Sequence, residues 1–136
     1  MKVVADTNIL IASVFWNGTP YQIVQMALDG HVEIFISRET LREVRKVLNK
    51  EFHLNEQEID DISRGLLLCC TLIDPTEIPP VVKRDPKDDH VIACAISARV
   101  ECIITRDKDI LDLKQYQSVK FMTPEEFLSS LFDPVK

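Results

Sequence analysis

Short aliphatic runs alternate with longer amphipathic stretches along this chain, and this alternation constrains its fold more than any other feature. Runs of three to five residues predict strands at 2–5, 32–36, 71–73, 102–104 and 118–122. The stretches between them predict helices at about 9–15, 19–29, 38–50, 56–69, 87–99 and from 124 onward. Strands that alternate with helices form βαβ units, so the sequence predicts an α/β fold with a parallel sheet covered on both faces.

Most of the predicted helices begin at a recognisable cap. Thr19 and Asn55 each open a predicted capping box, in which two residues three positions apart cap the helix reciprocally. Ser37 predicts the start of the helix at 38–50, and Asp85-Pro86 predicts the start of the helix at 87–99. Gly30 predicts the end of the helix that Thr19 opens. The last helix follows Thr123-Pro124-Glu125-Glu126 and is expected to pack through Phe127, Leu128, Leu131 and Phe132.

Size and composition indicate one globular domain, residues 1–136, with 46% hydrophobic and 28% charged residues. The first residues lack the charged and apolar segments of a signal peptide, and no apolar run reaches the roughly 18 residues that cross a bilayer. We therefore expect a cytoplasmic protein without membrane association. The cysteines form no C-x-x-C pair and lie among aliphatic residues, which predicts buried, reduced thiols for Cys69, Cys70, Cys94 and Cys102.

The net charge is −6 and the pI is near 5.0. This acidity argues mildly against nucleic-acid binding, because proteins of that class usually carry a basic surface. The argument weakens if several carboxylates share one site, since bound divalent cations would cancel part of their charge. Net charge also hides local patches, so it decides nothing by itself.

Acidic residues gather where the predicted strands end. Asp6 ends the first strand and precedes the small polar residues Thr7 and Asn8, and Asp107 closely follows the strand at 102–104. Three more acids crowd the start of the preceding helix: Asp85, Asp88 and Asp89. Ligands of parallel sheets bind at the carboxyl ends of the strands, which makes this edge the expected site. Taken singly, each of the other acids is better explained by helix capping or by the helix dipole, and Asp6 is the exception.

The helix at 38–50 separates two glutamates. At 100° per residue, its apolar side chains form one arc, and Glu43 falls at the border between that arc and the polar face. Glu39 falls further into the polar face. We therefore expect Glu43 to reach a cleft beside the sheet and Glu39 to be solvated.

Converging carboxylates favour one kind of chemistry. They resist ionisation unless cations lie between them, and carboxylate oxygens with water are the preferred ligands of Mg²⁺ and Mn²⁺. One or two such ions can deprotonate a water for attack on a phosphodiester and stabilise the leaving oxygen. The histidines form no ligand pattern; we expect His31 and His53 at the surface and assign no place to His90.

Four segments resemble, in order, the motifs of PIN domains, and the resemblance covers nearly the whole chain. The first is Asp6-Thr7-Asn8, and the second is Glu43 within residues 37–44. The third is Arg84-Asp85-Pro86-Lys87-Asp88-Asp89 with Ala93 and Ala95, and the fourth is Ile103-Ile104-Thr105-Arg106-Asp107. The sequence is most similar to bacterial and archaeal members that are toxin components of toxin–antitoxin pairs. Arg99-Val100-Glu101 departs from the Gly-Ala pair that relatives often carry.

The resemblance implies a three-layer α/β/α sandwich with a Rossmann-like sheet, and endoribonuclease activity on single-stranded RNA with Mg²⁺ or Mn²⁺. It also implies a homodimer and a small antitoxin partner. Carried over by position, the catalytic and metal-binding acids are Asp6, Glu43, Asp89 and Asp107. Asp88 is the alternative third acid, but the number of residues between Asp89 and Thr105 suits the family pattern and favours Asp89. The supporting residues are Asn8, Thr105, Asp85 and Asp88.

Two other functions are compatible with parts of the sequence. A phosphoacceptor signalling domain would use Asp6, Thr105 and Lys120, but it lacks the expected acidic pair after the first strand and gives Glu43 and Asp89 no role. A PIN fold could also bind RNA or a partner with little catalysis.

For an RNA substrate, basic residues near the motifs could contact phosphates: Arg84, Lys87 and Arg106 foremost, then Lys83, Lys108, Arg38 and Arg42. Trp16 or Tyr21 could offer a ring to a base, although ordinary packing is the better explanation for each.

Overall fold

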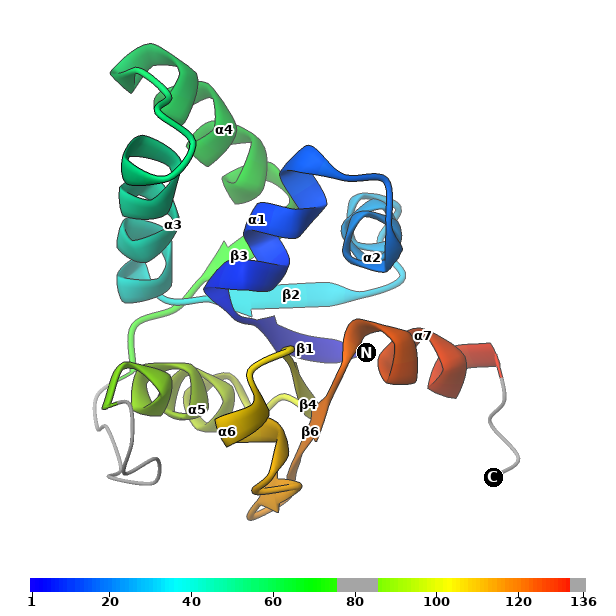
Figure 1. Cartoon of the computed structure of the whole chain (residues 1–136). Helices are drawn as coiled ribbons and strands as arrows, with labels where there is room; N and C mark the ends of the chain where they lie inside the picture. The colour runs from blue at the N-terminus through cyan, green and yellow to red at the C-terminus, as the bar shows by residue number, and fades with distance from the viewer. Residues whose placement is uncertain (76–85, 133–136) are drawn as a thin grey trace.

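A six-stranded sheet forms the centre of the molecule in the computed structural model, which describes residues 1–75 and 86–132 (Figure 1). Its strand order is β3-β2-β1-β4-β6-β5, and all neighbouring strands are parallel except β5 and β6. The strands are β1 (Lys2–Ala5), β2 (Glu33–Ile36), β3 (Cys70–Leu72), β4 (Cys102–Ile104), β5 (Gln115–Tyr116) and β6 (Val119–Met122). The predicted parallel α/β architecture is confirmed.

Helices cover both faces of this sheet. They are α1 (Thr7–Phe15), α2 (Thr19–Leu28), α3 (Arg38–Lys50), α4 (Glu56–Cys69), α5 (Pro86–Ala98), α6 (Lys108–Leu111) and α7 (Pro124–Phe132). Successive strand residues point to opposite faces. Val3 of β1 packs in one core with residues of α1 to α4 and α7, whereas Val4 packs in a second core with residues of α5 and α6. The fold is therefore the three-layer α/β/α sandwich that the resemblance implies.

Most of the predicted helix boundaries are confirmed by their hydrogen bonds. Ser37 Oγ accepts from the Thr40 amide at 3.1 Å, and Asn55 with Glu58 forms the predicted capping box. Thr123 and Glu126 cap α7 in the same reciprocal way. After α2, Gly30 adopts φ 84° and donates to Ala27, and His31 donates to Met26, which closes the helix as a Schellman motif.

Helix α5 ends with similar geometry but without glycine. Arg99 follows the helix at φ 56°, in the left-handed region that favours glycine, and the Val100 amide donates to the Ala95 carbonyl at 3.1 Å. This is the position at which the sequence departs from the Gly-Ala pair of PIN domains. The same helix termination is therefore reached here with an unfavourable residue.

Some local predictions were wrong. Thr19 is the first residue of α2 rather than its cap; Gly18 precedes it, and the Thr19 hydroxyl is hydrogen-bonded to Glu125 instead. Phe132 is 76% exposed and does not pack in the core. Strand β5 and helix α6 were not predicted, because segments of two and four residues are too short to show a periodic pattern.

All four cysteines are free thiols, as predicted, with Cys70, Cys94 and Cys102 buried and Cys69 half-buried. Burial raises the pKa of both Cys94 and Cys102 to about 12. No helix within residues 1–75 and 86–132 is long and apolar enough to cross a membrane.

Candidate functional site

The acidic edge of the sheet is organised by two neighbouring parallel strands. Ala5 at the end of β1 pairs with Ile104 at the end of β4, and the Asp6 amide donates to the Ile104 carbonyl at 3.3 Å. Asp6 and Thr105 are the residues that follow these two strands. The sheet register therefore brings them together although 99 positions separate them in sequence.

Asp6 is the most perturbed carboxylate of this edge, and it is only 7% exposed. Its Oδ1 accepts from the Ile9 amide at 3.1 Å, which caps α1, and its Oδ2 accepts from the Thr105 hydroxyl. Burial raises the pKa of Asp6 to about 6. The two hydrogen bonds oppose this shift, and the negative charges of Asp107 and Glu43 add to it.

Thr105 connects Asp6 to Asp107. Its buried hydroxyl donates to Asp6 and accepts from the Asp107 amide at 2.9 Å. Asp107 then caps α6, because its Oδ1 accepts from the Asp109 amide at 2.8 Å. Within the described residues, Asp107 Oδ2 accepts no hydrogen bond. Asp107 is thus a helix cap that still has one carboxylate oxygen available for a ligand.

The two glutamates of α3 are both half-buried, so Glu39 is less solvated than predicted, but they differ in their relation to Asp6. Glu43 is half-buried and lies close enough to Asp6 for its charge to raise the pKa of that carboxyl. Glu39 does not contribute to that shift and forms an ion pair with Arg42 at 3.2 Å. Glu43 therefore belongs to the electrostatic surroundings of Asp6, and Glu39 does not.

The third motif is described only in part. Asp89 is 6% exposed in the N-terminal part of α5, a helix that contacts β1, β2 and β4. It is not among the charges that shift the pKa of Asp6. Lys83, Arg84 and Asp85 lie outside the described residues, as do the side chains of Lys87 and Asp88.

The described residues bear on the predicted metal site in two ways. Within residues 1–75 and 86–132, no three Asp, Glu, His or Cys side chains lie close enough together to hold a metal ion as they stand. The donor set itself fits a hard cation, because it offers carboxylate and hydroxyl oxygens and a buried Asp6 whose pKa two neighbouring negative charges raise further. The prediction that all four acids converge therefore stays a prediction.

Other predicted residues have mixed surroundings. Asn8 is exposed, and its side chain forms no hydrogen bond with the described part of the chain. His31 and His53 are exposed, as predicted, and His90 is half-buried. Arg38 forms an ion pair with Asp74 at 2.6 Å, and Lys108 is exposed.

Arg106 is part of a contact that the sequence did not reveal. It forms an ion pair with Glu125 at 2.7 Å. Burial acts to raise the pKa of Glu125, but hydrogen bonds from Arg106 and Thr19 and the charge of Arg106 leave it lowered. The contact joins the segment after β4 to α2 and α7. No sequence pattern could have indicated it, because the three residues are far apart along the chain.

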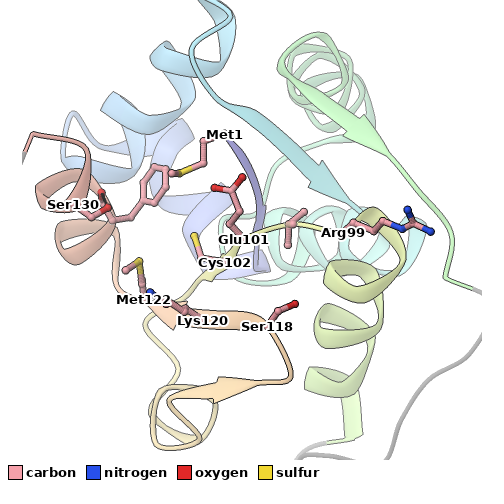
Figure 2. Close-up of a pocket in the computed structure, with 10 residues that line it drawn as sticks. Met1, Arg99, Glu101, Cys102, Ser118, Lys120, Met122 and Ser130 are labelled. Carbon is pink, nitrogen blue, oxygen red and sulfur yellow. Dashed lines mark hydrogen bonds between the residues drawn. The ribbon is translucent and has the colours of Figure 1, made fainter. Parts of the chain in front are cut away.

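A pocket of about 570 Å³ lies at the opposite, amino edge of the sheet (Figure 2). Met1, Glu101 and Lys120 line it from the starts of β1, β4 and β6, and Phe127 of α7 adds an apolar wall. None of the predicted acids lines it. Lys120 pairs with Cys102 at the start of β4, so it lies away from Asp6 and Thr105, and this separation disfavours the signalling-domain alternative.

Comparisons with known proteins agree with this geometry. A family model of the PIN domain matches residues 2–109. The fold is similar to a chain in the crystal structure of VapBC2 from Rickettsia felis bound to a DNA fragment from their promoter. That match has a TM-score of 0.63 at 15% identity and covers 89% of this chain and 97% of the other. No curated protein matches the sequence. Because the family model spans all four motifs in their order, the chain belongs to the PIN-domain family.

Proposed function

We propose that this protein is an endoribonuclease that cleaves single-stranded RNA with Mg²⁺ or Mn²⁺. One observation carries the proposal: in a PIN domain, a nearly buried aspartate at the end of β1 has a pKa near 6, raised by burial and by the charges of Asp107 and Glu43. Such a carboxyl is costly to ionise unless a cation is near. This cost is expected of a metal-binding site and is unusual for a residue that only caps a helix.

The proposed ligands are Asp6, Glu43, Asp89 and Asp107. A bound Mg²⁺ or Mn²⁺ would lower the pKa of a water molecule and offset the charge that develops on the phosphodiester. The protein groups around the ligands position them: the Ile9 amide and the Thr105 hydroxyl fix the two oxygens of Asp6. We also propose that Asn8, Asp85 and Asp88 support this edge and that Arg84, Lys87 and Arg106 contact RNA phosphates. For Arg106, such a contact would compete with Glu125.

We further propose that residues 1–136 form one domain, because Phe127 of α7, beyond the matched segment, is fully buried in the core shared by α1 to α4. We also propose a toxin role in the cytoplasm and a homodimer related by a two-fold axis, as the PIN-domain resemblance implies. The similarity in fold to a chain of the VapBC2 structure supports a small antitoxin partner. Sedimentation at tens of micromolar would test the dimer, and a monomer there would remove that part of the proposal alone.

Cleavage of single-stranded RNA by EDTA-treated protein tests the activity. We expect no products without metal and restored cleavage with Mg²⁺ or Mn²⁺. Restoration by Zn²⁺ alone would contradict the oxygen-donor site. Binding of RNA without cleavage in any of these metals would instead favour the alternative of an RNA-binding module. Transfer of phosphate from a small phosphodonor to Asp6 would favour the signalling domain.

A further inference from the structure

Three aromatic rings form a surface cluster at the far ends of α1 and α3. Phe15 and Phe52 stack with centroids 4.3 Å apart, and Trp16 meets both rings edge-on. Trp16 is 57% exposed, which is unusual for so large a ring. We call these residues the aromatic cluster. Packing of Phe15 against Phe52 accounts for those two rings, whereas the edge-on contacts of Trp16 leave more than half of that residue exposed.

The two helices that lead to this cluster both begin at the acidic edge (Figure 1). Asp6 caps the start of α1, and Phe15 and Trp16 lie at its end. Ser37 caps the start of α3, which carries Glu43, and Phe52 follows its end. The helices contact each other along the way. A 13-residue helix is about 20 Å long, so a ligand that bridged the acidic edge and the cluster would span several nucleotides.

The solvent face of α3 carries an unusual concentration of cations. Five of the 16 Lys and Arg residues lie within its 13 residues, although the chain has a net charge of −6. Arg45 is held by Asp60 of α4 at 2.7 Å and is a structural residue. The other four are exposed and recur every fourth position, so they lie on one side of the helix. We call them the basic ridge: Arg38, Arg42, Lys46 and Lys50.

The charges around the basic ridge indicate that its ligand is a polyanion. Arg38 and Arg42 form exposed ion pairs, with Asp74 and Glu39, and such pairs are weak enough for a phosphate to compete. Lys46 and Lys50 form no ion pair within the described residues. The neighbouring α4 starts with acidic residues, which would repel a strand from that side. Lysine is depleted in protein interfaces whereas arginine is enriched, so it is the two lysines of the ridge that favour nucleic acid over a protein partner.

We propose that single-stranded RNA runs from the acidic edge along the basic ridge, with its phosphates at Arg42, Lys46 and Lys50, and that one base stacks on Trp16. This inference rests on the proposed function for its substrate. A single strand is required because its base faces are free to stack on an aromatic ring, whereas those of a duplex are not. The ridge and ring would hold RNA by backbone and stacking without reading sequence.

Binding in EDTA tests this surface separately from cleavage. The full-length protein is titrated into a labelled 12-nucleotide single-stranded RNA, and anisotropy gives the affinity. Trp16→Ala should weaken binding about 5- to 150-fold, the usual loss of one stacked base, and Trp16→Phe should recover most of it. Phe132→Ala is the matched control, because it removes another exposed ring on α7. Equal affinity for wild type and Trp16→Ala would overturn the proposal.

The basic ridge has its own measurement, the salt dependence of the same affinity. Log affinity falls as log salt rises, and each phosphate contact on a single strand contributes roughly 0.7 to the steepness of that fall. Lys46→Ala combined with Lys50→Ala should therefore make the slope shallower by about 1.4. Arg64→Ala, an exposed cation of α4, should leave the slope unchanged. An unchanged slope in the double variant would overturn the proposed role of the basic ridge. Unaltered RNA affinity with altered sedimentation would overturn it too, because the surface would then join copies of the chain.

The two proposals fail in different ways. If Mg²⁺ or Mn²⁺ supports cleavage but neither Trp16 nor the lysines affect RNA affinity, the RNA path is wrong and the nuclease assignment survives. If RNA affinity depends on Trp16 and on the lysines but no metal supports cleavage, the RNA path is supported and the nuclease assignment fails.

Discussion

The two edges of the sheet differ in what they offer a ligand. The carboxyl edge holds Asp6, a nearly buried carboxyl whose pKa is raised to about 6 with two further negative charges nearby. The amino edge holds a pocket of about 570 Å³, in which the charged residues Glu101 and Lys120 are both exposed and opposite in sign. At the carboxyl edge, ionisation of Asp6 is unfavourable because the carboxyl is buried beside two negative charges. At the amino edge, the distinguishing feature is the volume of the pocket. We therefore propose the carboxyl edge as the site in spite of the larger volume at the amino edge, because perturbed ionisable groups cluster at functional sites.

The largest expected effect is on RNA cleavage, which should depend on the carboxyl edge and not on the amino edge. Asp6→Asn should lower RNA cleavage by more than about 100-fold, since loss of a metal ligand should exceed the 10- to 100-fold typical of groups around the ligands. Glu101→Gln and Lys120→Ala, at the amino edge, should leave cleavage within about twofold of wild type. The measurement is the initial rate with saturating Mg²⁺ or Mn²⁺. Loss of cleavage in the amino-edge variants with unchanged folding would reverse the comparison.

The unfavourable ionisation of Asp6 should make the stability of the metal-free protein depend on pH. A pKa of about 6 in the folded chain, against 3.8 when unfolded, means that the folded state holds the Asp6 proton more tightly. Its favourable contribution is complete below pH 3.8 and is lost as pH rises to about 6. Relative to Asp6→Asn, which does not titrate there, wild type should therefore lose at most about 3 kcal/mol between pH 4 and 7.

Denaturant unfolding of both proteins in EDTA at several pH values measures this difference. Ser118→Ala is the matched control from the amino edge, and its stability difference from wild type should not change over the same range, because the substitution removes no ionisable group. If the difference in unfolding free energy between Asp6→Asn and wild type were constant from pH 4 to 7, Asp6 would ionise freely, and its surroundings would not oppose ionisation.

Thr105 tests how the carboxyl edge is positioned. Its hydroxyl donates to Asp6 and accepts from the Asp107 amide, so Thr105→Val should leave both groups poorly oriented. We expect metal affinity and cleavage to fall about 10- to 100-fold, and Thr105→Ser to restore most of the loss. Measured metal affinity distinguishes positioning from a folding defect. Full activity in a folded Thr105→Val protein would mean that the hydroxyl only fills space.

The smallest expected effect concerns the stability that metal adds. At tenfold excess over Kd, Mg²⁺ should stabilise wild type by roughly 1.4 kcal/mol, or several degrees in Tm. The gain should be much smaller in Asp6→Asn and Asp89→Asn, and unchanged in Glu39→Gln, whose side chain pairs with Arg42. If Asp89→Asn melts and responds to metal as wild type does, Asp89 only stabilises the helix start, and Asp88 becomes the better third acid.

Sequence patterns predicted those parts of the molecule that depend on local periodicity. The aliphatic runs located β1 and β4, and the sheet then brought Asp6 and Thr105 together. The 100° rotation per residue in α3 placed Glu43 nearer the acidic edge than Glu39, and of the two only Glu43 raises the pKa of Asp6, although both are half-buried. Wrong or missed features depend on contacts between distant segments. Thr19 was predicted to cap α2 and instead binds Glu125, since a hydroxyl bonds to whichever partner the tertiary fold supplies.

The same division applies to the candidate site. The sequence indicated which acids follow which strands, and it allowed Asp107 as a helix cap, which it is. It gave no measure of how deeply Asp6 is buried, because burial depends on how α1 and α3 pack across the sheet edge. That burial is the largest cause of the raised pKa on which the proposed function rests.

Mn²⁺ binding followed by electron paramagnetic resonance tests the central claim most directly, because the signal of free Mn²⁺ falls as the protein binds it. The account predicts that wild type and Glu101→Gln remove Mn²⁺ from solution to the same extent and that Asp6→Asn removes far less. Equal binding by wild type and Asp6→Asn, with binding lost in Glu101→Gln, would place the metal at the amino edge and contradict the account.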